Sequence, residues 1–260
     1  MEFETLLYER RDHVIVVTLN RPEHKNAIIP KMRKELQQVW QDFNNDDDLW
    51  VSVLTGAGDD FCIGGDDDDS KGPSRDISTR PLFSGNNSKL SNRDEAHRIN
   101  TPKHNECWKP FILAVNGACS SGALHFLVDS DIAICSDDAT FWDTHTGRES
   151  VVIWEILQMT RRIPYVVASR MALMAEQEKL SAQRALEVGL VNEVVPKAQL
   201  RDHAIAIAEK VAKNDPHALI GTIEALWKGQ DLGMFQAIKQ GLILRQVQKY
   251  NMLLARQQKD

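Results

Sequence analysis

Two of the eight histidines, together with a nearby group of carboxylates, have side chains that are able to transfer protons. His125 and His145 carry imidazoles, whose ordinary pKa of about 6.5 suits proton transfer near neutral pH. A histidine that acts as a base usually needs an acceptor for its other ring N–H. The acidic residues nearest to them in sequence are Asp143, Glu149 and Glu155. The pattern indicates acid–base chemistry, although a lone histidine is more often a core or surface residue.

Glycines mark two turns that each follow a short apolar segment. The segment WVSVL precedes TGAGDDFCIGGD at 55–66, and FILAV precedes NGACSSGA at 116–123. Glycine permits a tight turn and lets the backbone approach a ligand closely. Taken singly, Gly65 and Gly122 would be ordinary turn residues.

Five collinear segments together resemble the crotonase (enoyl-CoA hydratase/isomerase) family. One such segment would be a weak signal, but five in the right order and spacing are specific. The resemblance covers the chain from about residue 14 to residue 196. The segments are TLNRP with KNAI within 18–28, TGAG with FCIGGD within 55–66, FILAVNG with SGA within 111–123, DSDIAI with ATF within 129–141, and LSAQRALEVGLVNEVVP at 180–196.

The resemblance implies an α/β fold and a pocket for an acyl-CoA thioester. Residues 1–195 would form a crotonase-like spiral of ββα units, and residues 196–260 a C-terminal helical trimerisation region. The backbone N–H groups of Gly65 and Gly122 would form an oxyanion hole for the thioester carbonyl. One such donor can lower a barrier by about 3 kcal/mol. Coenzyme A would be part of the substrate, so no separate cofactor is expected, and the assembly would be a homotrimer or hexamer.

The catalytic positions depart from the family pattern. Family hydratases place a glutamate three residues after the second oxyanion glycine and another four residues after the Phe of A-T-F. Here these positions hold His125 and His145. The next segment, SVVIWE at 150–155, lacks the family's Gly/Pro-rich turn and brings Glu155 near the expected site. We expect His125, His145 and Glu155 to be catalytic, and the resemblance leaves open which reaction they perform.

Substrate contacts also follow from the resemblance. Arg21, His24 and Lys25 lie where the family contacts CoA phosphates, and Lys25 is the expected ligand among them. The full set of expected substrate-binding residues is Lys25, Ala27, Ile63, Asp66 and Trp142.

Two clusters have the composition of cation sites but not the pattern. The four aspartates at 66–69 form a contiguous run without a coordinating turn, which is typical of a solvated loop. His97, His104 and Cys107 have only loose metal-like spacing. No metal site is expected.

The elements that must position these residues alternate between β and α. A β-branched run at 13–20 and an amphipathic pattern at 30–43 predict a strand and a helix. Further strands are predicted at 50–54, 111–116, 132–136, 140–142 and 191–196, and further helices at 154–175, at 181–190 and from residue 198 onward. The polar stretch 66–105 is predicted to be a long surface loop, with a helix beginning near residue 92.

Composition excludes several classes of protein. The net charge of −6 disfavours non-specific nucleic-acid binding, and no apolar run approaches the roughly 20 residues of a membrane span. The charged N-terminus lacks a signal-peptide pattern, so cytoplasmic residence is expected. The four cysteines form no C-x-x-C pair, and buried, inert thiols are expected at Cys119 and Cys135.

Three functions stay open from the sequence. The first is an enoyl-CoA hydratase or isomerase that uses histidines in place of glutamates. The second is a carbon–carbon bond hydrolase of the retro-Claisen type, because relatives that cleave β-diketones use a histidine with a carboxylate. The third is a non-catalytic binder of acyl-CoA or RNA, although the acidic net charge disfavours RNA.

Overall fold

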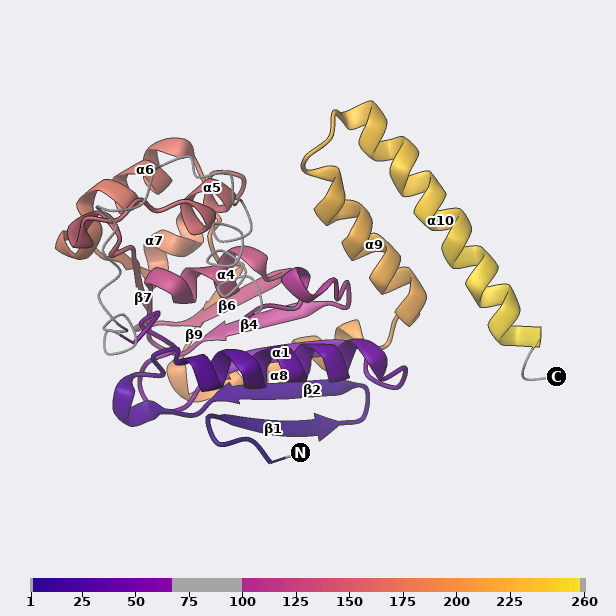
Figure 1. Cartoon of the computed structure of the whole chain (residues 1–260), viewed down its shortest axis with the longest axis horizontal. Coiled ribbons are helices and arrows are strands. Elements are labelled where there is room, and N and C mark those ends of the chain that lie inside the picture. The colour runs from indigo at the N-terminus through magenta and orange to yellow at the C-terminus, as the bar shows by residue number, and fades with distance from the viewer. Residues whose placement is uncertain (1, 67–99, 258–260) are drawn as a thin grey trace, which may run out of the picture.

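The computed structural model describes residues 2–66 and 100–257 and shows an α/β architecture around a six-stranded sheet (Figure 1). The first two strands, β1 (Leu6–Arg11) and β2 (Val14–Leu19), are antiparallel. The others run parallel to β2 in the order β3 (Val51–Gly56), β4 (Phe111–Val115), β6 (Ile132–Ser136) and β9 (Glu193–Val195). The predicted helix start near residue 92, His97 and the aspartates at 67–69 lie outside the described residues.

A second, three-stranded sheet lies beside the large one. It consists of β5 (Ala118–Ser120), β7 (Thr140–Trp142) and β8 (Leu180–Ser181). A single parallel bridge between Cys62 and Cys119 attaches the loop after β3 to this sheet. The two glycine turns predicted from the sequence are therefore joined by backbone pairing.

The inner strands β2, β3, β4 and β6 are buried on both faces, which is why their sequences read as largely apolar runs. In β2, Ile15 and Val17 pack into one hydrophobic cluster, whereas Val14 and Val16 pack into another. The first cluster includes residues of α1 (Pro30–Asn45) and α4 (Leu124–Asp129), and the second includes residues of α8 (Lys197–Val211). The alternation of side chains along each strand thus separates the two helical layers.

Most of the predicted elements are confirmed, and two predictions need correction. Strand β1 was not predicted, because its sequence LLYERR carries charged residues on an exposed edge. The single helix predicted at 154–175 is wrong: it is divided into α5 (Trp154–Met159) and α6 (Tyr165–Met174). Pro164 stands immediately before α6 and has no N–H to continue the earlier helix. Ser181 caps α7 (Ala182–Glu187), its side-chain oxygen accepting from the N–H of Arg184.

The C-terminal helices divide into one that covers the sheet and two that form a hairpin. Helix α8 packs on the large sheet, whereas α9 (Pro216–Gly229) and α10 (Met234–Gln257) lie side by side and project from the body (Figure 1). The boundary at 195/196 stays a prediction. None of the helices in the described ranges has both the length and the apolar character that a membrane span requires.

All four cysteines are buried free thiols. Burial raises the pKa of Cys62 and of Cys135 to about 12 and raises that of Cys119 well above its ordinary value. The prediction of buried thiols at Cys119 and Cys135 is confirmed, and the raised pKa values make them poor nucleophiles.

Candidate active site

Two buried asparagines hold together the loops that follow the parallel strands. The side-chain amide of Asn26 donates to the carbonyl oxygens of Ala57 and Asp60, both at 2.9 Å, while its oxygen accepts from the N–H of Arg21 at 2.9 Å. Asn116 accepts from the N–H of Gly56 at 3.0 Å and donates to the carbonyl of Gly58 at 2.9 Å. The loops at the carboxyl edge of the sheet therefore have fixed relative positions.

The backbone around Gly65 leaves the N–H of this residue facing away from its parallel neighbour. Ile28 donates to the carbonyl of Gly64 at 2.7 Å and accepts from the N–H of Asp66 at 3.1 Å. In a parallel bridge of this kind, the intervening residue directs its own N–H to the opposite side. That side faces the turn of Gly122, because a Cβ added at Gly122 would lie 3.7 Å from the Gly65 nitrogen.

Gly122 is the second residue of the 3-10 helix η4 (Ser121–Ala123). The first N–H groups of a helix have no acceptor within it. The Gly65 nitrogen therefore lies next to the Gly122 turn, and the binding of one oxygen by both N–H groups stays a prediction.

The strained backbone lies one residue before each of these glycines. Gly64 has φ +93° and Ser121 has φ +52°, whereas Gly65 and Gly122 are not in the left-handed region. A Cβ at Gly65 or Gly122 would make only contacts of 3.7 Å or longer. The turn itself therefore does not require a glycine at either position, and an oxyanion role for the two N–H groups stays a prediction.

His125 and Glu155 form a buried pair. The Nε2 of His125 lies 3.0 Å from Oε1 of Glu155, and their side chains are only 4% and 5% exposed. His125 belongs to α4, which follows the Gly122 turn directly, and Glu155 lies in the first turn of α5. The Nε2–H group therefore donates to the carboxylate.

His145 is the third predicted residue that the fold brings to this cluster. Its Nε2 lies 3.9 Å from Oε1 of Glu155, the same oxygen that faces His125. Its Nδ1 lies 2.8 Å from Oδ2 of the fully buried Asp143, whose Oδ1 accepts the backbone N–H of His145 at 2.8 Å. Asp143 thus holds the proton on Nδ1 and leaves Nε2 as the proton-accepting nitrogen. Of the three acidic candidates named from the sequence, Asp143 and Glu155 contact the histidines, and Glu149 is exposed.

The charges of these pairs alter the proton affinities. Burial lowers the pKa of His125, but the hydrogen bond and charge of Glu155, together with the charge of Asp129, raise it overall. The hydrogen bond to Asp143 raises the pKa of His145. Burial raises the pKa of Glu155, but its hydrogen bond and charge interaction with His125 lower it overall. The His125–Glu155 pair therefore favours imidazolium and carboxylate.

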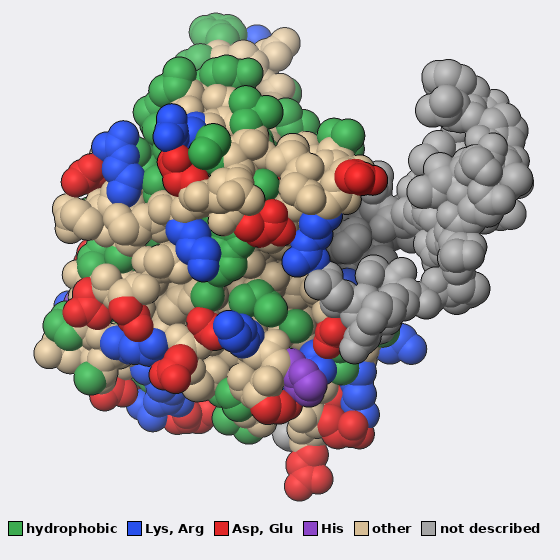
Figure 2. All heavy atoms as spheres, turned by 90° about the vertical axis from the view of Figure 1, so that its left-hand side faces the viewer, with side chains coloured by type: hydrophobic (Ala, Val, Ile, Leu, Met, Phe, Trp, Pro, Cys, Tyr) green, Lys and Arg blue, Asp and Glu red, His purple; other side chains and the backbone are tan. Residues whose placement is uncertain are grey.

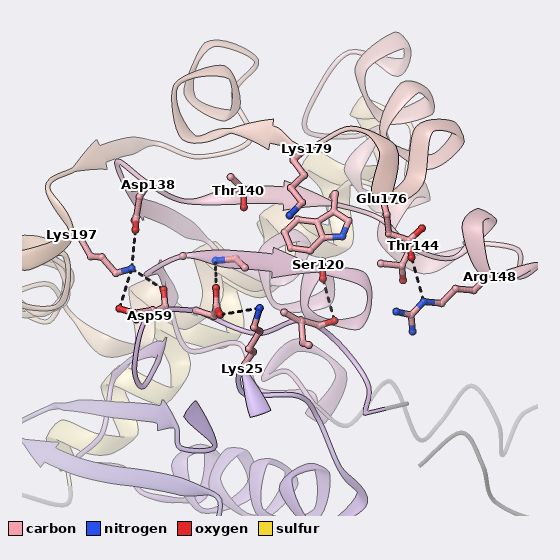
Figure 3. A pocket seen from close by; sticks show the side chains of 15 residues that line it. Lys25, Asp59, Ser120, Asp138, Thr140, Thr144, Arg148, Glu176, Lys179 and Lys197 are labelled. Carbon is pink, nitrogen blue, oxygen red and sulfur yellow. Dashed lines mark hydrogen bonds and ion pairs between the residues drawn. The ribbon is translucent and has the colours of Figure 1, made fainter. Parts of the chain in front are cut away.

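A cavity of about 550 Å³ opens beside these turns (Figure 3). The predicted catalytic and oxyanion residues do not line it: they are Gly65, Gly122, His125, His145 and Glu155. Lys25, Ile63 and Trp142, all predicted as substrate contacts, line it. Ala27 and Asp66 do not line it: Ala27 is buried and Asp66 pairs with Arg21 at 3.3 Å.

The cavity wall carries four cations and four carboxylates, and most of the cations are already paired. They are Lys25, Arg148, Lys179 and Lys197 opposite Asp59, Asp60, Asp138 and Glu176. Lys197 donates to Asp138 at 2.8 Å, whereas Arg148 lies 3.4 Å from Glu176 and Lys25 lies 4.0 Å from Asp60. Lys179 instead lies over the ring of Trp142, 4.1 Å from its centroid.

Charges of both signs are also interspersed on the face that Figure 2 shows. The sequence pointed to Lys25 alone among the four cations. The other three come from segments after β7 and α6 and from the start of α8, and tertiary packing brings them together.

Within residues 2–66 and 100–257, no group of three or more His, Cys, Asp or Glu side chains is arranged to hold a metal ion. Cys107 is buried in the hydrophobic core, whereas His104 lies beside His125 with ring centroids 6.4 Å apart.

Comparison with known proteins adds independent evidence. A family model described as enoyl-CoA hydratase/isomerase matches residues 9–244. The chain is 34% identical over 232 residues to an (E)-benzylidenesuccinyl-CoA hydratase of Thauera aromatica, covering 88% of this chain and 85% of that protein. It is 30% identical over 237 residues to a mevalonyl-coenzyme A hydratase of Aspergillus fumigatus, covering 89% and 81%. The crystal structure of an enoyl-CoA hydratase/isomerase from Mycobacterium paratuberculosis superimposes with a TM-score of 0.84 at 36% identity, covering 94% and 90%. The predicted fold class is confirmed.

Proposed function

The chain belongs to the enoyl-CoA hydratase/isomerase family, and from this membership we propose that it adds water to the double bond of an α,β-unsaturated acyl-CoA thioester. The observation that carries the proposal is the position of Glu155, whose Oε1 lies 3.0 Å from Nε2 of His125 and 3.9 Å from Nε2 of His145. Two imidazoles and one carboxylate can together supply the acid and the base that hydration needs. Coenzyme A enters as part of the substrate.

In this reaction the oxyanion hole receives the charge that moves onto the thioester. The N–H groups of Gly65 and Gly122 donate to the carbonyl oxygen while water attacks the β-carbon. His145 accepts a proton from that water through Nε2, because Asp143 occupies its Nδ1. His145 is suited to this role because its side chain is 25% exposed, compared with 4% for His125.

The enolate then takes its proton at the α-carbon. His125, whose pKa is raised by Glu155, supplies this proton from Nδ1, because its Nε2–H donates to the carboxylate. The new bonds are one C–O bond and one C–H bond, and the hydroxyl and the α-proton together correspond to one water. The hydratases of Thauera and Aspergillus carry in their names the same overall reaction class.

The test is a panel of enoyl-CoA and β-keto-CoA thioesters with mass-spectrometric detection of products. We expect products that gain one water without fragmentation. The double variant His125→Ala/His145→Ala should lose about 10²-fold or more of the turnover rate. His203→Ala is the matched control, because His203 also contacts a glutamate, at 2.6 Å from Glu193, but on the outer surface. Turnover that survives the double change unaltered would contradict the proposal, and thioester binding without turnover in the wild type would favour a binding protein.

A second candidate is hydrolysis of the carbon–carbon bond of a β-diketone. The balanced charge of the cavity favours it, since a phosphate-bearing ligand would have to compete with carboxylates for the paired lysines. Water activated by His145 would attack one ketone carbonyl, the bond to the neighbouring carbon would break, and that carbon would take a proton. Two-fragment or ring-opened products from a β-diketone without coenzyme A would select this reaction over hydration.

We also propose that the chain assembles as a homotrimer or hexamer through its C-terminal hairpin. Apolar side chains remain exposed along α10, among them Phe235, Ile238, Leu242 and Ile243. The hairpin extends away from the body, where a second copy can reach it (Figure 1).

A further inference from the structure

A second histidine–aspartate contact lies directly behind the His125–Glu155 pair. Asp129 is fully buried, and its Oδ2 accepts the hydroxyl of Thr101 at 2.6 Å and lies 3.4 Å from Nδ1 of His104. Thr101 Oγ1 also lies 3.2 Å from this Nδ1. Since the hydroxyl proton of Thr101 points to Asp129, its oxygen is left to accept the Nδ1–H of His104. These contacts fix the orientation of the His104 ring.

Asp129, whose carboxylate contacts His104, is unusual because a charged side chain is rarely fully buried. Asp129 Oδ1 is buried and accepts no hydrogen bond from the part of the chain that the structure describes. Arg162 lies near enough for its charge to interact with Asp129. A buried carboxylate is costly to retain unless it is hydrogen-bonded or paired, so Asp129 is held by contacts rather than by solvent.

The ring of His104 contacts His125 and the residue that precedes Glu155 in the chain. Its centroid lies 6.4 Å from that of His125 at an interplanar angle of 72°, and 6.5 Å from that of Trp154 at 74°. Trp154 is the chain neighbour of Glu155 at the start of α5. Edge-to-face contacts of this kind restrict how each ring can turn. One imidazole therefore stands between the helix that carries His125 and the helix that carries Glu155.

We propose that His104 is a positioning residue for the His125–Glu155 pair, held in its own place by Asp129 and Thr101. The role rests on the proposed acid–base function of that pair. His104 itself belongs to the 3-10 helix η3 (Lys103–Asn105), so a segment outside the sheet orients the pair.

The charged and titratable groups that face His125 determine how the loss of the His104 ring should alter the pKa of His125. Glu155 faces it from α5, Asp129 from its own helix, His145 from the turn after β7 and His104 from η3. Glu155 and Asp129 raise the pKa of His125, which burial and His145 lower. Loss of the His104 ring should loosen the contact with Glu155 and thereby reduce the largest raising effect.

The first experiment titrates His125 by NMR in the protein without substrate, in wild type, His104→Ala and His104→Phe. In His104→Ala the titration midpoint of His125 should fall by about half a pH unit or more. His104→Phe keeps a ring against His125 and Trp154 and should recover at least half of that shift. A midpoint unchanged in His104→Ala overturns the proposal, as does a Phe variant that titrates like the Ala variant or an equal shift in the control His203→Ala.

A second variant covers the case in which His104→Ala fails to fold. Thr101→Val removes the hydroxyl that contacts both His104 Nδ1 and Asp129 without a change of charge, and it should shift the midpoint in the same direction. A midpoint that stays at the wild-type value or rises in this variant overturns the proposal.

Turnover gives an independent readout. With an enoyl-CoA substrate, kcat should fall about tenfold in His104→Ala while KM stays within about twofold. An equal loss in kcat and rise in KM overturns the positioning role. Wild-type protein without any hydratase turnover would contradict the proposed function alone, since the titration needs no substrate.

Discussion

His145 differs from His125 in its access to solvent and in the carboxylate that it contacts. Asp143 binds its Nδ1 at 2.8 Å, and this hydrogen bond raises the pKa of His145 above its ordinary value of 6.5. A histidine with a raised pKa keeps its proton to a higher pH, so the proton-accepting form is lost as the pH falls through that raised value. The hydratase reaction should therefore lose rate on the acidic side.

Replacement of Asp143 by asparagine should shift the pH at which the reaction rate declines. In Asp143→Asn the pKa of His145 should fall toward its ordinary value, so the acidic limb of kcat/KM should shift to lower pH. The rate at the plateau should also drop about tenfold or more, because the imidazole loses its orienting carboxylate. The measurement is a pH profile of kcat/KM. Glu149→Gln removes an exposed carboxylate nearby and should leave the profile unchanged; an unmoved limb in Asp143→Asn would refute the assignment of His145 as the base.

Substitutions at Gly122 and Gly64 can separate obstruction of the proposed oxyanion hole from loss of fold stability. A methyl group at Gly122 would make only ordinary contacts, the nearest of them 3.7 Å from the Gly65 nitrogen. Gly122→Ala should therefore retain its melting temperature and lose about 10²–10³-fold in kcat, as expected when an oxyanion donor is obstructed.

Gly64→Ala is the contrasting variant. Its φ of +93° and a Cβ only 2.7 Å from that of Ser121 should destabilise the fold by about 1–3 kcal/mol. Calorimetry and steady-state kinetics on both variants provide the comparison. A Gly122→Ala enzyme with wild-type kcat would show that this turn supplies no oxyanion donor.

At the level of elements, Asn26 joins the loop after β2 to the loop after β3. It is fully buried, has φ +55° and makes three hydrogen bonds. Asn26→Ala should lose these bonds and add the strain of a left-handed alanine, for a total of about 3 kcal/mol of unfolding free energy.

Asn26→Gly serves as the control, because glycine tolerates the left-handed backbone. It should lose the hydrogen bonds alone and be more stable than Asn26→Ala by about 1 kcal/mol. Urea denaturation measures both. Equal stabilities would show that the backbone conformation contributes nothing.

The elements that could be predicted are those in which local pattern and tertiary packing agree. Strand β6 and strand β7 have the bounds predicted for them, because β-branched and aromatic residues there are bounded by polar ones. Strand β1 escaped prediction because its charged residues suit an exposed edge, and only the pairing with β2 makes it a strand. The break between α5 and α6 depends on Pro164, whereas the apolar pattern continues across it and so predicted a single helix.

The site could be predicted in part for a similar reason. Motif spacing indicated His125, His145 and Glu155, and the fold brings these three together. Spacing could not select Asp143 from its acidic neighbours, nor associate Asp129 with His104, because those contacts join segments through tertiary packing. The same holds for Lys179, whose position over Trp142 depends on the pairing of β7 with β8.

For the whole molecule, the exposed apolar surface indicates association. In Figure 2 hydrophobic side chains gather at the top of the view. On α6, Tyr165, Val166 and Leu173 are among the exposed apolar residues. The α9–α10 hairpin presents another such surface. Exposed apolar side chains on both parts of the chain support the proposed homotrimer or hexamer.

Substitution on α10 tests the assembly. Ile238 and Leu242 lie one helical turn apart and are 54% and 52% exposed. Ile238→Asp/Leu242→Asp should reduce a trimer or hexamer to smaller species, measured by size-exclusion chromatography with light scattering. Leu7→Asp is the matched control, because Leu7 is also 52% exposed but lies on β1. A wild-type monomer, or a double variant of unchanged mass, would contradict the proposal.

The shared oxygen of Glu155 has a consequence for how the proposed enzyme resets between turnovers. Each hydration leaves His145 with an added proton and His125 with a missing one. Oε1 faces the Nε2 atoms of both rings, at 3.9 Å and 3.0 Å, but the Nε2 of His125 keeps the proton that it donates to this oxygen. The carboxylate therefore cannot pass the surplus proton of His145 to the nitrogen of His125 that lost one. Water must exchange protons with both rings, so at fixed pH the steady-state rate should rise with buffer concentration wherever this exchange limits turnover.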